Sequence, residues 1–388
     1  MANGITVLLG AGSILDISPN LSTQRLTEII LEFPYVDDLS LPEHTKRRYE
    51  AIKLIKDVDE YCQRDGKRSS FESIFQVILD IYSQKQIGTP GVSLSFEVPS
   101  FCSETSCLIC EEALGFILEK VYMNISHETK MDPPEWFSEF FASLTEWCNH
   151  SIHLDCYTLN YDTLIDRSLP RFNDGYELKS KDYSVFNPRK ARLTKSMVPI
   201  LNHIHGSILF NYRPSEETDT NDILYKYDKP VSSVGVGNLL VTTQLRRYAM
   251  FSPIITGMDK TNSITVDPFS VYHSNFINSL IRNDVLLIIG YGFGDNYLNY
   301  LLGSYDRWGK KTTILVSPTT DEALFAEVKS KGKQMGGCHI YGNYVWFDCT
   351  FAEACKKGLM EFIKDHTSTK FRKELASALR VAYKNSWK

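Results

Sequence analysis

The sequence predicts an α/β protein in which a doubly wound parallel sheet carries a helical subdomain inserted after its first strand. Two observations lead to this prediction. Short apolar runs of the kind that form buried parallel strands recur along the chain, at residues 5–9, 154–159, 198–204, 284–289, 312–316 and 344–347. Between the first two runs, residues 21–150 instead keep a helical pattern. Strands that alternate with helices are typical of a parallel sheet covered on both faces.

Length and composition describe an ordinary globular protein. With 388 residues, 43% of them apolar, the chain can bury a large core in one large or two modest domains. The net charge of −5 gives no general attraction to nucleic acid, so we expect no direct nucleic-acid binding. The strand at residue 5 leaves no room for a signal peptide, and residues 285–289 are far too short to cross a bilayer. We therefore expect a cytoplasmic protein that does not enter the membrane.

The nine cysteines predict free thiols rather than a disulfide scaffold, because their number is odd and the chain is long. Cys107 and Cys110 form a C-x-x-C pair with Cys102 nearby, which raises the question of a zinc site. A structural zinc ion needs four clustered ligands, and no second C-x-x-C follows at a usable spacing. We therefore expect no zinc.

The first strand ends in the glycine-rich turn Gly10-Ala11-Gly12-Ser13. Glycines there let the backbone approach a phosphate, and a helix that starts directly after them would offer free N–H groups. A complete dinucleotide fingerprint would have a third glycine at position 15, where this chain has Leu15. A plain strand-to-helix turn explains the same residues equally well.

The inserted stretch predicts four helices and one long loop. The helices are expected around residues 26–33, 71–79 and 107–125, and after the Pro133-Pro134 pair. The aromatic residues of the fourth helix are expected in the core or at a subunit interface. Residues 86–104 are rich in glycine, proline and serine and predict a loop.

Asn160 lies where the second strand passes into a helix. Residues 154–159 form the strand, and Asp162 can cap a helix over 163–169. In an open α/β sheet, ligands bind at this carboxyl edge of the strands. An amide can orient a ligand there without carrying charge. The alternative is a turn in which Asn160 and Asp162 satisfy only local backbone groups.

Two histidines follow the next strand, in the segment His203-Ile204-His205-Gly206-Ser207. Residues two apart on a strand point to the same face, so His203 and His205 are expected side by side, as a metal-binding pair would be. No third ligand is apparent, and imidazole titrates near neutral pH, which favours one of the two as an acid or base in a cleft. A hydrogen-bonded core histidine is the alternative for either one.

The second half of the chain contains another glycine-rich strand end. Residues 211–265 have little periodicity, and their strand-like content is confined to 239–243. The strand at 284–289 ends in Gly290-Tyr291-Gly292-Phe293-Gly294-Asp295, which indicates a second place where the backbone can touch a nucleotide. The alternative is that Asp295 only caps the helix that follows. Further helices are expected at 267–281, 322–331, 351–364 and 370–384.

Taken in order, four motifs resemble those of the sirtuin (SIR2) family. They are Gly10-Ala11-Gly12-Ser13, Leu159-Asn160-Tyr161-Asp162, His203-Ile204-His205-Gly206-Ser207 and Ile289-Gly290-Tyr291-Gly292. The resemblance spans residues 5–316. It implies a Rossmann-like catalytic core over residues 1–20 and 151–350, a helical insertion over 21–150 and C-terminal helices over 351–388.

The resemblance also implies roles for single residues. NAD⁺ would bind across the sheet edge as substrate. Asn160 would position the nicotinamide ribose and the attacking water, Asp162 would contact the nicotinamide amide, and His205 would act as general base on the ribose. Cleavage of the bond between nicotinamide and ribose builds positive charge on the sugar, which suits a neutral amide and a near-neutral base. The other residues implied in NAD⁺ binding are Gly10, Ala11, Gly12 and Ser13 near the pyrophosphate, Gly290, Gly292 and Val316 near the adenosine half, and Gly206 and Ser207.

Two departures separate this chain from the protein-deacylating sirtuins. Their four-cysteine zinc module is missing, since no cysteine lies between Cys156 and Cys338, and residues 15–19 replace the Pro-Asp-Phe-Arg segment of those enzymes. The chain is therefore more similar to the sirtuin-like effectors of bacterial antiphage defence, which act in abortive infection by hydrolysing NAD⁺ to nicotinamide and ADP-ribose.

Within that group the chain resembles the subunit that pairs with a HerA-type ATPase, so control by a homo-oligomer or by such a partner is expected. Two alternatives to the NAD⁺ hydrolase stay open. One is an NAD-dependent protein deacylase or ADP-ribosyltransferase. The other is a catalytically silent NAD or ADP-ribose sensor that scaffolds an assembly.

Overall fold

A mainly parallel sheet forms the centre of the computed structural model and confirms the predicted α/β fold class. Six strands pair in parallel, in the order β5 (Ile200–His203), β2 (His153–Thr158), β1 (Gly4–Leu9), β10 (Val285–Ile289), β11 (Thr312–Val316) and β14 (Tyr344–Phe347). An antiparallel hairpin of β13 (Cys338–Tyr341) and β12 (Lys333–Met335) extends the β14 edge. The structure describes residues 4–34, 42–64, 69–87, 105–148, 152–192, 198–213, 223–230, 237–240, 248–251, 253–256, 264, 266–306, 311–319, 323–335 and 337–366.

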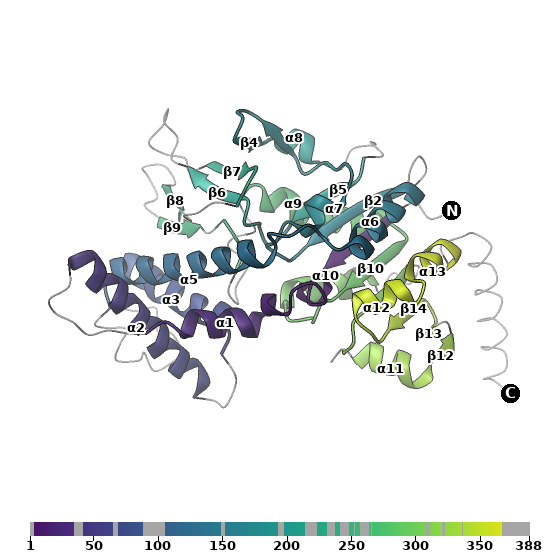
Figure 1. Cartoon of the computed structure of the whole chain (residues 1–388), viewed down its shortest axis with the longest axis horizontal. Coiled ribbons are helices and arrows are strands. Elements are labelled where there is room, and N and C mark those ends of the chain that lie inside the picture. Colours follow the sequence, from purple (N-terminus) through teal and green to yellow (C-terminus); the bar gives the residue numbers. More distant parts are fainter. Residues whose placement is uncertain are drawn as a thin grey trace.

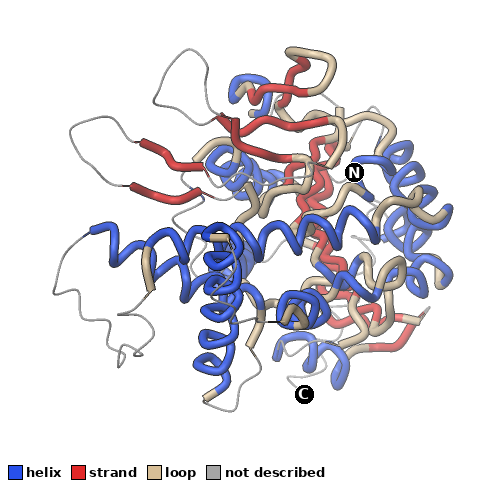
Figure 2. Tube along the Cα trace, turned by 60° about the vertical axis from the view of Figure 1, so that its left-hand side comes forward, coloured by secondary structure: helices blue, strands red, loops and turns tan. Residues whose placement is uncertain are grey.

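The sheet is buried on both faces, because successive residues of a strand point to opposite sides. In β1, Val7 and Leu9 belong to one hydrophobic cluster, and Leu8 belongs to the other. The first cluster includes side chains of α6 (Glu135–Cys148), α12 (Phe351–Lys356) and α13 (Leu359–His366). The second includes side chains of α9 (Phe269–Arg282), α10 (Asn296–Asp306) and α11 (Ala323–Lys331). Figure 2 shows helices on both sides of the strands.

The chain changes its winding direction next to β1. From β1 it runs outward to β2 and β5, and it then returns to the opposite side of β1 to form β10, β11 and β14. Such a reversal leaves a crevice beyond the carboxyl ends of the strands, where ligands of doubly wound folds bind. The turns that follow β1, β2 and β10 therefore meet at one point.

Four helices of the inserted stretch pack together beside the sheet and project to the left in Figure 1; they are α1 (Thr23–Leu31), α2 (Glu43–Gln63), α3 (Phe71–Ile87) and α5 (Cys107–Glu128). The hydroxyl of Tyr122 on α5 lies 3.2 Å from the carbonyl oxygen of Ser207 and 3.1 Å from that of Phe210. This contact ties α5 to the loop after β5. Helix α6 packs instead against β2, α12 and α13. The domain boundaries at residues 20, 150 and 350 stay a prediction.

A second, antiparallel sheet corrects the expectation that residues 211–265 have strand content only at 239–243. The sheet contains β3 (Tyr176–Leu178), β4 (Tyr183–Phe186), β7 (Ile223–Tyr227) and β6 (Phe210–Arg213), and β8 (Gly237–Leu240) pairs separately with β9 (Tyr248–Phe251). In β7 the inward-facing positions are Leu224 and Lys226. A lysine at an inward position hides the alternation of apolar and polar residues that indicates a strand.

Other details of the helices also differ from expectation. The turn after β1 is a short 3₁₀ segment, η1 (Ala11–Ser13), and the first α-helix begins only at Thr23. The single helix expected at 351–364 is two helices, because Gly358 between them has φ +83°. Residues 88–104 of the expected loop and the helix expected at 370–384 lie outside the described residues.

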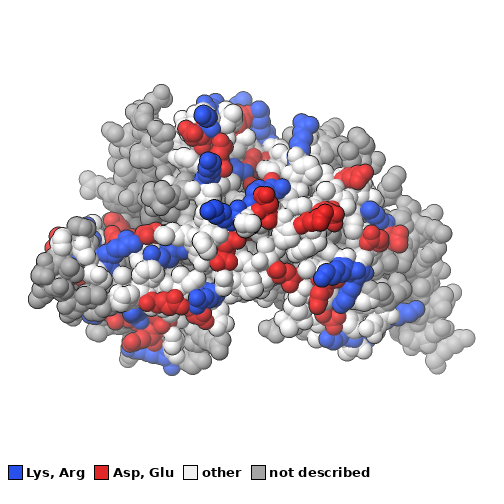
Figure 3. Space-filling view, in the orientation of Figure 1, with Lys and Arg blue, Asp and Glu red and all other residues white. Residues whose placement is uncertain are grey.

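Three observations concern the expectations about cysteines, nucleic-acid binding and membrane segments. Eight cysteines are described, and all eight are free thiols. Over the face drawn in Figure 3, acidic and basic side chains are intermingled rather than separated by sign. Among the helices of the described ranges, none combines the length and the apolar character needed to span a bilayer.

Candidate functional site

A cavity of about 460 Å³, called here the sheet-edge cavity, lies beyond the carboxyl ends of the central strands. Its volume is within the range of small-molecule sites. Eight residues singled out from the sequence line it: Gly10, Ala11, Gly12, Asn160, Asp162, His205, Gly290 and Gly292. Inserted helices close one side through Thr23, Leu26, Phe71, Glu72 and Ile125. The cavity therefore lies between the sheet edge and the helical insertion.

The two glycine-rich turns touch each other at the base of this cavity. The Gly12 N–H donates to the Gly290 carbonyl at 2.8 Å, and a Cβ built on Gly290 would lie 2.0 Å from the Ser13 nitrogen. Gly290 also has φ +63°, a conformation that side-chain-bearing residues rarely adopt. A Cβ on Gly292 would meet nothing within 4 Å, so the backbone there is open. Close approach of the two turns accounts for Gly12 and Gly290 without any ligand.

Asn160 follows β2 and is 8% exposed. Its Nδ2 donates to the Ser13 hydroxyl at 3.1 Å, and that hydroxyl donates to the Gly10 carbonyl at 2.7 Å. The amide is therefore fixed by the turn after the neighbouring strand. Within the described chain, its Oδ1 makes no hydrogen bond, so this oxygen is available to accept one from a ligand.

Asp162 precedes Thr163, the N-cap residue of α7 (Leu164–Ser168), so it is not itself the predicted helix cap; its Oδ1 accepts the Leu164 N–H at 2.8 Å in a local turn. Its Oδ2 is buried and has no hydrogen-bond partner among the described residues. Burial raises the pKa of Asp162 to about 6, since a charged carboxylate is poorly solvated there. A buried acceptor on the wall of a cavity suits a ligand that brings an N–H group.

His205 lies in the turn after β5, and its Nε2 is 3.2 Å from Oδ2 of Asp295. Both side chains are buried and both residues line the sheet-edge cavity. Asp295 also caps α10 through its Oδ1, which accepts the Leu298 N–H at 3.0 Å. Asp295 therefore caps the helix as predicted, but it does not only cap it, because it also contacts His205. The hint available in the sequence was an acidic residue at the end of a glycine-rich strand turn.

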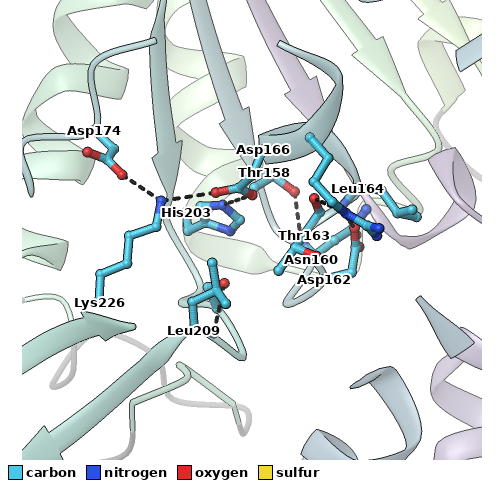
Figure 4. Close-up of polar contacts among 12 residues, drawn as sticks. Thr158, Asn160, Asp162, Thr163, Leu164, Asp166, Asp174, His203, Leu209 and Lys226 are labelled. Atoms are coloured by element: carbon cyan, nitrogen blue, oxygen red, sulfur yellow. Dashed lines mark hydrogen bonds and ion pairs between the residues drawn. The ribbon is translucent and has the colours of Figure 1, made fainter. Parts of the chain in front are cut away.

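The expectation that His203 and His205 face the same way is wrong. Strand β5 ends at His203, so His205 lies in the following turn and no longer follows the strand alternation. His203 Nε2 contacts Asp166 Oδ2 at 2.8 Å, and Lys226 Nζ binds Asp166 at 3.0 Å and Asp174 at 2.6 Å (Figure 4). We call these four side chains the buried charge network. It holds α7 against the antiparallel sheet.

In the buried charge network, the charges of neighbouring groups outweigh the effect of burial on the pKa values of Asp166 and Lys226. Burial alone would raise the pKa of Asp166, but the charges of His203 and Lys226 outweigh it and hold that pKa well below its usual range. Burial alone would lower the pKa of Lys226, but Asp166 and Asp174 raise it above its usual range. Asp166 and Lys226 therefore stay ionised, and their contacts hold α7 behind the Asn160 turn.

Four residues assigned from the resemblance are not among those that line the sheet-edge cavity. Ser13 lies behind Asn160, as described above. Gly206, with φ +92°, and fully buried Ser207 form the turn after His205. Val316 is buried inside the sheet, and the cavity is lined instead by the residues that follow it, Ser317, Pro318 and Thr319.

Charges of one sign line the sheet-edge cavity. Its described lining includes the acidic side chains Glu72, Asp162 and Asp295 and contains no lysine or arginine. From the sequence, Glu72 is interpreted only as part of a Ser69-x-x-Glu72 capping box; its place at the site was missed, because it belongs to a helix that is distant along the chain. Such a lining favours a ligand that carries or develops positive charge near these carboxylates.

A second cavity of about 700 Å³ is lined by residues of α7 and β7, and two of its basic side chains, Lys226 and Arg167, are already engaged. Lys226 is bound to two carboxylates of the buried charge network. Arg167 donates to the carbonyl oxygens of Thr129 at 2.7 Å and Met131 at 2.9 Å. The sheet-edge cavity, with open acceptors on Asn160 and Asp162, is therefore the better candidate.

Metal ligation finds no support in the same residues. In the described ranges, no three His, Cys, Asp or Glu side chains gather as metal ligands would. His203 and His205 each face an aspartate rather than each other. The two rings therefore do not form the side-by-side pair that strand alternation predicts.

Comparisons with known proteins give one family match and several distant structures. No curated protein matches the chain. A triple mutant of a Sir2 homologue in complex with 2'-O-acetyl ADP ribose is 11% identical over 95% of both chains, with a TM-score of 0.41. A Sir2 homologue in complex with NAD is 13% identical over 95% of this chain and 91% of the other, with a TM-score of 0.42. Since these TM-scores are low, the fold assignment rests on the sheet topology itself.

The family match covers the part of the site that follows β2 in the sequence. The family model described as the SIR2-like domain matches residues 155–331, which is less than half of the chain. That span includes Asn160, His205 and Asp295 and leaves out the turn after β1. Over residues 155–331, therefore, the chain is similar to the SIR2-like domain.

Proposed function

We propose that this chain is an NAD⁺ glycohydrolase that cleaves NAD⁺ to nicotinamide and ADP-ribose. The observation that carries the proposal is that Asn160 and His205, which follow different strands, line one cavity of small-molecule size. The similarity of residues 155–331 to the SIR2-like domain supports the choice of substrate. Structures of Sir2 homologues named as NAD and ADP-ribose complexes concern other proteins, and they only suggest which ligands to test.

The proposed reaction breaks the bond between the ribose C1' and the nicotinamide nitrogen. The bonding electrons leave with nicotinamide, which becomes neutral, and the ribose becomes cationic. Water then adds to C1' and releases one proton. The acidic lining of Glu72, Asp162 and Asp295 supports this chemistry, because carboxylates stabilise a cationic sugar.

Each polar group of the cavity has a role in this proposal. Asn160 Oδ1 accepts a hydrogen bond from the ribose or from the attacking water, since Ser13 already holds Nδ2. Asp162 Oδ2 accepts from the nicotinamide amide, which satisfies an otherwise unpaired buried oxygen. His205 takes the released proton as general base. The open backbone at Gly292 and Gly294 supports close contact with the nucleotide.

A direct test is to follow nicotinamide and ADP-ribose after adding NAD⁺ to the purified chain, alone and with a co-expressed partner. We expect equal amounts of the two products, and losses of about 10²-fold to 10⁴-fold in Asn160→Ala and His205→Gln. His339→Gln is the matched control, because His339 also contacts an aspartate, Asp348 at 3.5 Å, but does not line the cavity. Unchanged NAD⁺ in every condition would contradict the proposal.

The same assay separates the two alternatives. A deacylase or ADP-ribosyltransferase gives O-acyl-ADP-ribose or a modified protein in place of free ADP-ribose. A silent sensor binds NAD⁺ or ADP-ribose without turnover, and Asn160→Ala and His205→Gln then leave cellular toxicity unchanged.

The proposal extends to antiphage defence through depletion of NAD⁺, with a homo-oligomer or a HerA-type ATPase as the controlling assembly. The resemblance of the four motifs supports this role. The test is to measure cellular NAD⁺ during phage infection with the wild-type chain and with His205→Gln. A fall in NAD⁺ that is independent of His205 would contradict it.

A further inference from the structure

The carboxylate of Asp295 is held by contacts at both of its oxygens. Oδ1 accepts the Leu298 N–H at 3.0 Å, and Oδ2 lies 3.2 Å from His205 Nε2. A carboxylate that served only as a helix cap would need one of these contacts. The second oxygen is instead directed at the histidine of the sheet-edge cavity.

Hydrogen bonds of the Tyr291 hydroxyl hold the turn that carries Asp295. The Tyr291 hydroxyl accepts the Asp295 N–H at 3.3 Å and lies 2.8 Å from Asn299 Oδ1. Asn299 in turn donates to the Phe293 carbonyl at 2.7 Å. Phe293 has φ +56°, which is unusual for a residue with a large side chain. Several interactions therefore fix the backbone from which Asp295 reaches His205.

We propose that Asp295 is a positioning residue that acts through His205: its carboxylate orients the imidazole and stabilises the positive charge that the ring gains when it accepts a proton. The kinetic part of this inference rests on the proposed function. The proton balance is simple, because the ring takes up the one proton that hydrolysis releases and Asp295 stays ionised. An opposite charge at this distance favours the protonated ring.

Other charged groups near His205 need separate controls. Asp162 and Glu72 line the same cavity, and the His203–Asp166 pair lies behind the Asn160 turn. Asp295 contacts His205 at ion-pair distance. Asp162→Asn therefore serves as the control for another carboxylate of the same cavity.

The decisive experiment does not need turnover. The full chain carrying ¹³C-labelled histidine is titrated by NMR, and the His205 signal is assigned by its loss in His205→Gln. We expect Asp295→Asn to lower the His205 titration midpoint by about one pH unit or more, relative to wild type. Asp348→Asn, which removes the partner of His339, should leave the His205 midpoint unchanged. Equal midpoints, or equal absence of titration, in wild type and Asp295→Asn would overturn the inference.

Asp295→Asn is suited to this test because asparagine is also a good helix cap and can still accept the Leu298 N–H. If wild type releases nicotinamide, we expect kcat to fall about 10-fold to 100-fold in Asp295→Asn with little change in KM. The acidic limb of the pH profile should move to lower pH, and Asp295→Glu should recover part of kcat. Unchanged kcat beside a lowered midpoint would overturn the positioning role and leave the NAD⁺ hydrolase intact. If wild type lacks turnover, the proposed function fails and the NMR result alone decides the contact.

Discussion

His203 and His205 are two residues apart, buried, and each paired with an aspartate, yet their surroundings differ. His203 contacts Asp166 inside the buried charge network, where Lys226 binds both Asp166 and Asp174. His205 contacts Asp295 on the wall of the sheet-edge cavity. The comparison teaches that an aspartate partner alone does not distinguish a histidine inside the protein from one on a cavity wall. What matters is whether a ligand can reach the ring, which gives the comparison testable consequences.

The largest expected effect separates the two rings by activity. His205→Gln should lower nicotinamide release by about 10²-fold to 10⁴-fold, because it removes the proposed general base. Its thermal midpoint should stay close to that of wild type. His203→Gln should instead lower the free energy of unfolding by ~1–3 kcal/mol, because Asp166 loses a hydrogen-bond partner inside the protein. Kinetics and thermal unfolding of both variants check the contrast, and a reversed pattern would contradict it.

The next effect concerns the stability that the buried charge network supplies. Lys226→Met leaves Asp166 and Asp174 without their shared cation, so we expect a loss of ~3 kcal/mol in unfolding free energy near pH 7. The pKa of Asp166 is depressed, so its contribution is present above its unfolded value and is lost as the pH falls. The difference between Lys226→Met and wild type should therefore shrink in acid. Urea unfolding across pH measures it, and Lys229→Met is the exposed control.

A third effect concerns Asp162, whose pKa is shifted in the opposite direction to that of Asp166. Burial raises the pKa of Asp162 to about 6, so the folded state holds a proton that the unfolded state has released. Stability from this group is full in acid and falls as the pH rises from about 4 to about 6. Asp162→Asn removes that loss and keeps the hydrogen bond with the Leu164 N–H, so we expect it to exceed wild type by ~1–3 kcal/mol above pH 6. Thermal unfolding between pH 4 and pH 8 is the measurement, and parallel curves for the two proteins would contradict it.

The smallest effect comes from a third pair of the same kind. His339 lies 3.5 Å from Asp348, which is 28% exposed and also binds Lys329. We expect His339→Gln to change the unfolding free energy by less than ~1 kcal/mol, because water screens such pairs. It should leave nicotinamide release unchanged. A loss of activity in this variant would show that the assay responds to general destabilisation.

The sequence was sufficient for the parallel strands, because each contains a short run rich in apolar and β-branched residues. It failed for β7, where Lys226 occupies an inward position whose partners, Asp166 and Asp174, are distant along the chain. The cavity itself followed from motifs at strand ends, since parallel strands bring their carboxyl ends to one edge. The orientation of His205 did not, because it depends on β5 ending two residues earlier. The contribution of Glu72 likewise depends on tertiary packing of the insertion.

Tyr122 links two parts of the molecule that are far apart in sequence. Its hydroxyl reaches the carbonyl oxygens of Ser207 and Phe210, immediately beyond His205. Helix α5, which carries Tyr122, also lends Ile125 to the cavity wall. Any force that rotated this helix would thus strain the histidine loop and reshape the cavity in the same movement. The helical insertion is therefore mechanically connected, through α5 and Tyr122, to the loop that follows His205.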